Sequence, residues 1–153
     1  MYAADRGAYE TAVFAMRSRA GSVAVQTRAL FWLSTFGFAG QPELGDRAPG
    51  DRLTVFVGNS PLYRHAVLAA RAGAFKAIVA AMRAHSLVPA LMFNGCSALN
   101  GLMTDSETKR AAFDAGALDV ILLALRLTAS SEFLSVAALP AIRLPSWSMV
   151  VQK

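Results

Sequence analysis

The chain has 153 residues, of which 55% are hydrophobic and 16% charged, and its formal net charge is +5. This length fits one domain, and the apolar content excludes an intrinsically disordered chain. Twelve arginines supply most of the basic charge, but they are scattered, and the longest basic run is Lys109-Arg110. A solvated surface therefore explains the charge better than a basic stripe for nucleic acid, which stays the alternative.

The cysteine content and the charge distribution bear on the cellular compartment. Cys96 is the only cysteine, so the chain cannot form an intramolecular disulfide. Charged residues occur within the first ten positions, where a signal peptide would have its apolar core. Both features favour the cytoplasm, with the nucleus as the alternative. The longest uncharged run, 86–104, is interrupted by proline, asparagine and glycine, so we expect a buried helix and no membrane span.

A segment of the chain is repeated. Residues 72–83 return as residues 115–126, at an offset of 43, and residues 5–17 match residues 71–83 at an offset of 66. The glycines that the three copies share are Gly7, Gly73 and Gly116. A helical repeat with a period of 40–47 residues is typical of an α-solenoid. The sequence therefore predicts an all-α fold.

The repeat divides one domain, 1–153, into three units, an insertion and a tail. The units cover about 1–36, 61–104 and 105–144, the insertion covers about 37–60, and the tail covers 145–153. The insertion is rich in Gly, Pro and Asp, which is typical of a surface loop. Its apolar stretch 53–57 fits either a short extended segment or a helix.

Each complete unit is expected to contain three helices. The first helix is predicted over 61–70 and 106–114, with Ser60 and Ser106 as N-caps. The shared glycine then turns the chain, because glycine adopts positive φ at little cost. The second helix is predicted over 74–85 and 117–127 from apolar residues at a spacing of three to four. The third helix carries an Ala-Leu-x-x-(Leu/Ile) motif, which occurs at 29–33, 98–102 and 138–142.

The glycine turn and the motif of the third helix resemble the armadillo repeat family. The x-x-Ala-Gly-Ala-apolar turn and the Ala-Leu-x-x-Leu motif extend over most of the chain, in about three repeats. The resemblance implies a right-handed superhelix of three-helix repeats, whose third helices line a concave groove. HEAT repeats, which have two helices, are the nearest structural alternative. Armadillo proteins have many unrelated functions, so the resemblance implies a fold more than a function.

In the armadillo family, an Asn and a Trp one helical turn earlier clamp an extended peptide in this groove. The positions that match the Asn hold Trp32, Gly101 and Ala141, and those that match the Trp hold Arg28, Ser97 and Ala137. Asn100 lies one residue away and would point about 100° aside. The missing Asn ladder argues against clamping of the nuclear-import kind. The small residues in the later units would instead leave room for a bulky element such as a helix.

Two sets of residues are open to a functional and a structural interpretation. Arg28 and Trp32 share a helix face at a spacing of four. They either form a binding hot spot, in which both residue types are enriched, or pack as part of the fold. The arginines near the ends of the second helices either stabilise the helix dipole or form an anion-binding row; they are Arg17, Arg83 and Arg126.

Enzyme chemistry is not expected. The sequence contains no phosphate-binding glycine loop, nucleophile elbow or pair of carboxylates at a useful spacing. His65, His85 and Cys96 lack the spacing of a zinc site. We therefore expect no catalytic residue, no metal and no cofactor.

The most favoured function is non-catalytic protein binding on the third-helix face, as a scaffold or adaptor. The alternatives are nucleic-acid binding by a basic α-solenoid, and a structural spacer of a larger protein. A solenoid needs polar caps on its terminal repeats, but the first unit lacks its first helix and Pro140 lies within the last predicted helix. We therefore expect a fragment of a longer array or self-association through the uncapped ends.

Overall fold

The fold is all-helical, as the sequence predicted. The computed structural model describes residues 3–38 and 61–128, and these contain seven helices and no strand. The helices are α1 (Ala3–Ser18), α2 (Val23–Phe38), α3 (Pro61–Arg71), α4 (Ala74–Ala84), α5 (Pro89–Leu102), α6 (Ser106–Asp114) and α7 (Ala117–Thr128). The insertion 37–60 lies almost entirely outside the described residues, as do the motif at 138–142 and the tail.

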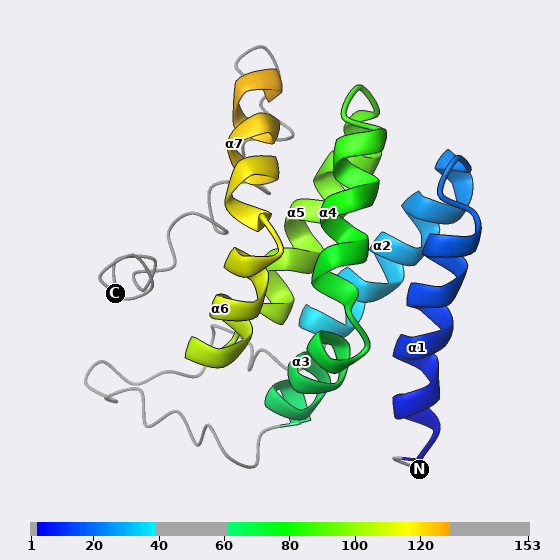
Figure 1. The fold of residues 1–153 in the computed structure, drawn as a ribbon, viewed down its shortest axis with the longest axis vertical. Helices are drawn as coiled ribbons and strands as arrows, with labels where there is room; N and C mark the ends of the chain where they lie inside the picture. Colours follow the sequence, from blue (N-terminus) through cyan, green and yellow to red (C-terminus); the bar gives the residue numbers. More distant parts are fainter. Residues whose placement is uncertain (1–2, 39–60, 129–153) are drawn as a thin grey trace, which may run out of the picture.

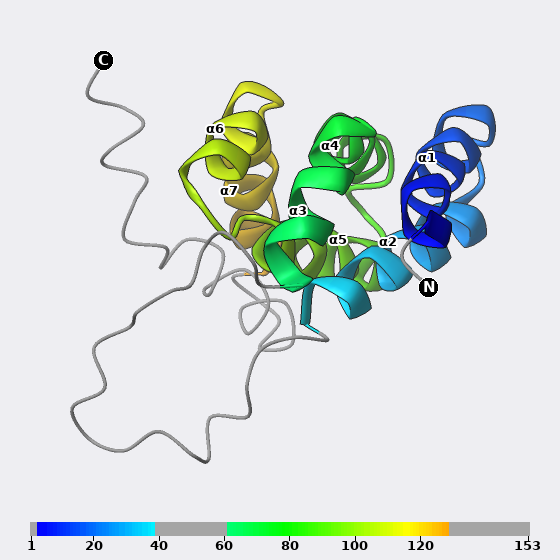
Figure 2. The same cartoon turned by 90° about the horizontal axis from the view of Figure 1, so that it is seen from below.

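The helices form two layers. Figure 1 shows α1, α4 and α7 upright beside one another, and α1 contacts α4, which contacts α7. Figure 2 shows α2 and α5 below α1 and α4, and the α2–α5 contact is the most extensive in the described part of the chain. The shorter helices α3 and α6 also contact each other. Helices that hold the same place in the sequence repeat therefore lie next to each other.

The core lies between these layers and consists of aliphatic, alanine and methionine side chains. Leu30, Leu33, Ile78, Leu99 and Ile121 are fully buried in it. These residues come from α2, α4, α5 and α7, so one continuous core joins helices of both layers. The apolar positions spaced three to four residues apart, which predicted the helices, are the positions that the core buries.

The glycine turn was predicted correctly at two of three positions. Gly73 has a φ of 79° and Gly116 a φ of 84°, and both separate a first helix from a second. The prediction for Gly7 was wrong, because Gly7 lies inside α1. The first copy of the repeat has no described helix ahead of this glycine from which the chain would need to turn. The helix therefore continues through it, since glycine is tolerated there at about 1 kcal/mol relative to alanine.

The N-cap of α6 is Asp105 and not Ser106. The Asp105 carboxylate accepts a hydrogen bond of 2.8 Å from the Thr108 backbone N–H, and the Thr108 hydroxyl accepts one of 3.2 Å from the Asp105 N–H. This reciprocal pair is a capping box, which satisfies two N–H groups that the helix leaves free. Ser60, the other predicted N-cap, lies outside the described residues.

Within 3–38 and 61–128, every individual helix is too short or too polar to cross a membrane. One pair meets the criteria of length and composition jointly, residues 64–71 with 74–84, but it is bent by 69° at its break. The uncharged run 86–104 contains the 14 residues of α5, eight of which are buried.

Candidate partner-binding face on α2 and α5

One face of α2 is exposed along most of its length. Ala24, Arg28, Phe31 and Thr35 are exposed, and their spacing of three to four residues places them on one side of the helix. Phe31 is 62% exposed. An aromatic ring leaves water readily when a partner covers it, and the neighbouring Arg28 carries a positively charged guanidinium. This face therefore offers an apolar anchor beside a fixed positive charge.

Helix α5 continues this face. The α1–α2 and α4–α5 connections have the same length, so the 66-residue offset extends into the third helix and pairs Arg28 with Asn94 and Phe31 with Ser97. This register replaces the one that the Ala-Leu motif gave, in which Arg28 matched Ser97. Asn94 and Ser97 are half-buried, and the Asn94 side-chain amide donates a hydrogen bond of 3.5 Å to the Thr27 carbonyl on α2. The α2–α5 face thus combines exposed residues of α2 with partly covered polar residues of α5.

Trp32 takes part in the core. It is half-buried, and its ring centroid lies 5.3 Å from that of Tyr9 at an interplanar angle of 59°. The buried Tyr9 hydroxyl in turn lies 3.0 Å from Nδ1 of His65. This cluster joins α1, α2 and α3, so Trp32 is held by contacts within the fold. Of these two adjacent aromatic residues, Phe31 is the exposed one.

The other residues predicted on this face have different surroundings. Arg28 is exposed, and Asn100, like Ser97, is half-buried. Gly101 is buried, so in this structure it offers no surface to a partner; by the 66-residue offset it matches the exposed Thr35. Ala137 and Ala141 lie outside the described residues.

Two of the three repeated arginines, Arg17 and Arg83, lie over the glycine turns that follow them in the repeat. A Cβ atom built on Gly73 would lie 2.9 Å from Nη2 of Arg17, and one built on Gly116 would lie 2.8 Å from Nη2 of Arg83. Arg83 also forms an ion pair of 3.2 Å with Asp119 in the first turn of α7. Each arginine therefore bridges the second helix of one unit and the turn of the next.

Cys96 and His85, two of the three residues weighed as zinc ligands, have contacts that belong to the fold. Cys96 is buried, and burial raises the pKa of its thiol from 9.0 to about 12, because desolvation disfavours the thiolate. His85 Nε2 lies 2.8 Å from the Ala20 carbonyl, a contact that joins the loops after α1 and α4. Within 3–38 and 61–128, no three His, Cys, Asp or Glu side chains lie close enough to share a metal ion.

Comparisons with known proteins give no further guide. The chain matches no protein-family model, no curated protein and no solved structure. The armadillo resemblance therefore depends on the residues of this sequence, and the function is argued from the described surfaces.

Proposed function

We propose that this chain is a short armadillo-type α-solenoid that binds a protein partner on its α2–α5 face. The proposal of a solenoid is supported by the contacts between helices of equal place in the repeat: α1 with α4, α4 with α7, α3 with α6, and α2 with α5. Stacking of equivalent helices is how repeat proteins bury a continuous core. The extended surface of such a stack serves as a scaffold or adaptor for other proteins.

The exposure of Phe31 beside Arg28 is the observation that carries the binding proposal. Large apolar side chains that are exposed next to arginine are typical of the centre of protein interfaces. The ring of Phe31 provides apolar area, and the guanidinium of Arg28 attracts an acidic group of the partner. Asn94 and Ser97 supply hydrogen-bonding groups at the edge of the same face.

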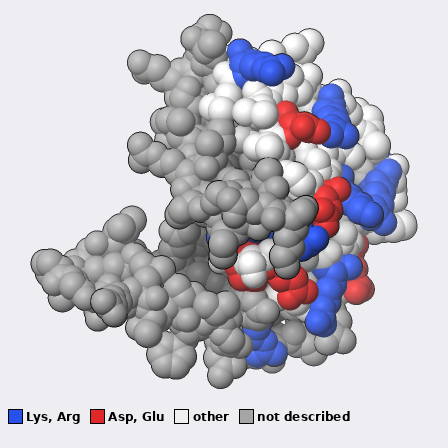
Figure 3. Space-filling model, turned by 60° about the vertical axis from the view of Figure 1, so that its left-hand side comes forward, with Lys and Arg blue, Asp and Glu red and all other residues white. Residues whose placement is uncertain are grey.

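The distribution of charge favours a protein over a nucleic acid. On the face drawn in Figure 3, basic and acidic side chains are interspersed over the described part of the surface. A nucleic-acid footprint requires basic residues that cluster along one stripe. The net charge of +5 is compatible with an acidic partner and does not by itself indicate phosphate contacts.

The proposal is tested by affinity capture from a lysate of the source organism at low and high salt. The test variant is Arg28→Ala/Phe31→Ala, in which both substitutions are at exposed positions. The matched control is Phe14→Ala, which removes an aromatic ring that is 70% exposed on α1, away from the face. We expect a protein that is retained at high salt, is lost with the double variant and is still bound by the control.

Three results contradict this proposal in different ways. Nucleic acid that is recovered at low salt but not at high salt supports a basic solenoid, because phosphate contacts weaken steeply with ionic strength. Loss of the same protein with Phe14→Ala moves the binding surface to the other layer. Equal recovery with all variants leaves a structural spacer as the better description.

A further inference from the structure

Two equivalent spaces, which we call intervals, lie between neighbouring second helices. The side chains that fill these two intervals differ in size. One lies between α1 and α4, and the other between α4 and α7. The α4 residues that line the first interval are all alanines: Ala77, Ala80, Ala81 and Ala84. Their counterparts on α7, at the offset of 43, are Val120, Leu123, Ala124 and Leu127. Three of the four positions are therefore larger in the second interval.

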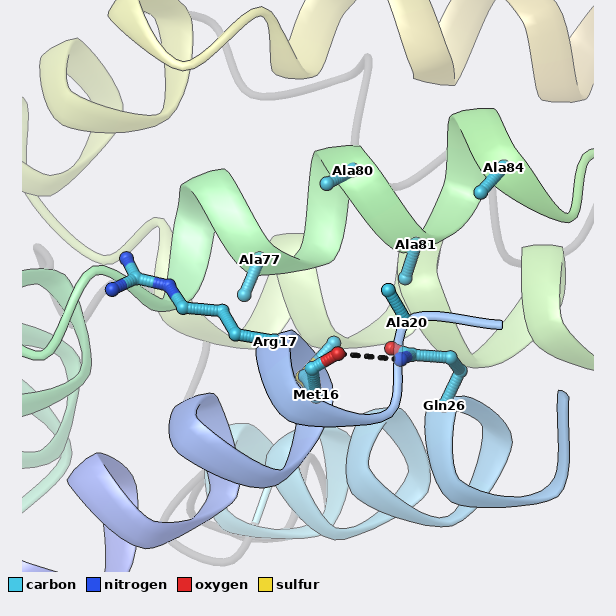
Figure 4. A pocket seen from close by; sticks show the side chains of 8 residues that line it. All are labelled: Met16, Arg17, Ala20, Gln26, Ala77, Ala80, Ala81 and Ala84. Carbon is cyan, nitrogen blue, oxygen red and sulfur yellow. Dashed lines mark hydrogen bonds between the residues drawn. The ribbon is translucent and has the colours of Figure 1, made fainter. Parts of the chain in front are cut away.

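The alanines leave a cavity of about 240 Å³ between α1 and α4. Figure 4 shows the alanines of α4 along one side, with Met16 and Arg17 of α1 and Ala20 of the following loop opposite. Gln26 of α2 closes it from below. Apolar cavities with a few convergent polar groups are the usual form of small-molecule sites, and this volume suits a ligand smaller than a typical drug. We name this cavity the alanine pocket.

Gln26 supplies a buried polar atom that lacks a partner. Its side chain is 1% exposed, and Nε2 donates to the carbonyls of Met16 and Arg19 at 2.7 and 3.0 Å. These two bonds orient the amide, while the buried Oε1 accepts no hydrogen bond from the described residues. A buried acceptor without a donor destabilises the fold. The counterpart of Gln26 at the offset of 66 is Met92, which needs no partner.

The charge at one end of the pocket also differs from that of the second interval. Arg83 in the second interval is neutralised by Asp119, but the counterpart of Asp119 is Lys76. Arg17 therefore has no acidic partner among the described residues, and a second cation stands in the first turn of α4. The N-terminus of α4 adds its partial positive charge there. This end of the pocket favours an anion.

We propose that the alanine pocket binds a medium-chain alkyl carboxylate that carries a hydroxyl group. Its carboxylate lies at Arg17, its hydroxyl donates to Oε1 of Gln26, and its alkyl chain lies along the alanines of α4. From Ala77 to Ala84 the helix rises by about 10 Å, which matches an extended chain of roughly eight carbons. This site is distinct from the α2–α5 face, because Gln26, the residue of α2 that lines the pocket, is buried and does not belong to the exposed side of α2.

The experiment is an NMR titration of protein labelled at the methionine methyl groups, with Met16 in the pocket as the reporter. The ligands are 6-hydroxyoctanoate, octanoate and 1-octanol, which differ in hydroxyl and charge. We expect saturable shifts of Met16, with affinity decreasing in that order. Octanol that binds as tightly as octanoate overturns the role of Arg17, and the absence of any saturable shift overturns the site.

Two substitutions at exposed positions of α4 give the first interval the leucines that α7 contributes to the second interval. Ala80→Leu/Ala84→Leu introduces the α7 residues and fills the pocket, so affinity for every ligand falls by roughly tenfold or more. Ala90→Leu, at an exposed alanine outside the pocket, is the matched control and leaves affinity unchanged. Shifts that persist in the filled variant show an adventitious contact and refute the proposal.

A second pair of variants tests the two polar groups separately. Lys76→Asp restores the residue that neutralises the arginine in the second interval, so it weakens both carboxylates and leaves octanol unaffected. Gln26→Met copies Met92 and abolishes the preference for the hydroxylated acid over octanoate, while octanoate itself still binds. A preference that survives Gln26→Met refutes the placement of the hydroxyl.

Discussion

Substitution of Gly73 by alanine tests the glycine turn most directly. The φ of 79° at Gly73 lies in the left-handed region, where a residue with a Cβ atom loses about 1–2 kcal/mol. The new Cβ would also lie 2.9 Å from Nη2 of Arg17. That atom is the far end of a flexible, exposed side chain, so it moves aside at little further cost. We therefore expect the free energy of unfolding to fall by about 1–2 kcal/mol.

The assay is urea unfolding followed by circular dichroism, with Gly7→Ala as the matched control. Gly7 lies inside α1, and a Cβ atom there meets nothing within 4 Å, so the same substitution should stabilise the protein by about 0.5–1 kcal/mol. Gly73→Ala in an Arg17→Ala background should retain most of its effect. If Gly73→Ala proves neutral, or if removal of Arg17 abolishes its effect, backbone strain is not the cause.

Three further predictions concern single side chains. Asp105→Ala should lower the free energy of unfolding by about 1 kcal/mol through loss of the α6 cap, while Asp105→Ser should retain most of it; urea midpoints decide this. Asp119→Asn should change stability by less than about 0.5 kcal/mol, because the pair with Arg83 is exposed, and a larger change in urea unfolding contradicts this. Cys96 should resist thiol reagents until the protein unfolds. Because burial raises its pKa from 9.0 to about 12, the unfolded thiol ionises first, so stability should fall from about pH 9 upwards, and less so in Cys96→Ala.

The helices and two of the glycine turns could be predicted because their causes are local. The first and second helices of the later units follow from apolar spacing and from the glycine between them, and the structure places their ends within one residue of the prediction. Gly7 shows the limit of this reasoning. A glycine requires a turn only when a helix precedes it, and the sequence motif alone does not contain that condition.

The exposed face of α2 could not be predicted from the motif, because exposure depends on neighbouring helices. Trp32 and Phe31 are adjacent, and both are suitable interface residues. The contact of Trp32 with Tyr9, a residue 23 positions away on α1, decides which of them is covered. Extended into α5, the 66-residue offset pairs Phe31 with the half-buried Ser97. This pairing was the sequence signal that Phe31, and not Trp32, lies on the exposed side of α2.

The alanine pocket leads to a last prediction, in which stability and binding change in opposite directions. Ala80 and Ala84 are exposed at the edge of a cavity, so leucines there would cover apolar surface that now faces open space. At about 0.8 kcal/mol per buried CH₂, and with the leucines partly covered, Ala80→Leu/Ala84→Leu should raise the free energy of unfolding by about 2 kcal/mol.

The equivalent α7 positions already carry leucines at both places, so the repeat accommodates this filling. A chain that leaves the first interval open forgoes that stability, which is the expected trade-off when a cavity serves a ligand. Thermal and urea unfolding of the filled variant, beside Ala90→Leu, decide the point. If the filled variant is less stable than the parent, its leucines meet atoms and not open space, and the interval between α1 and α4 is closed in solution.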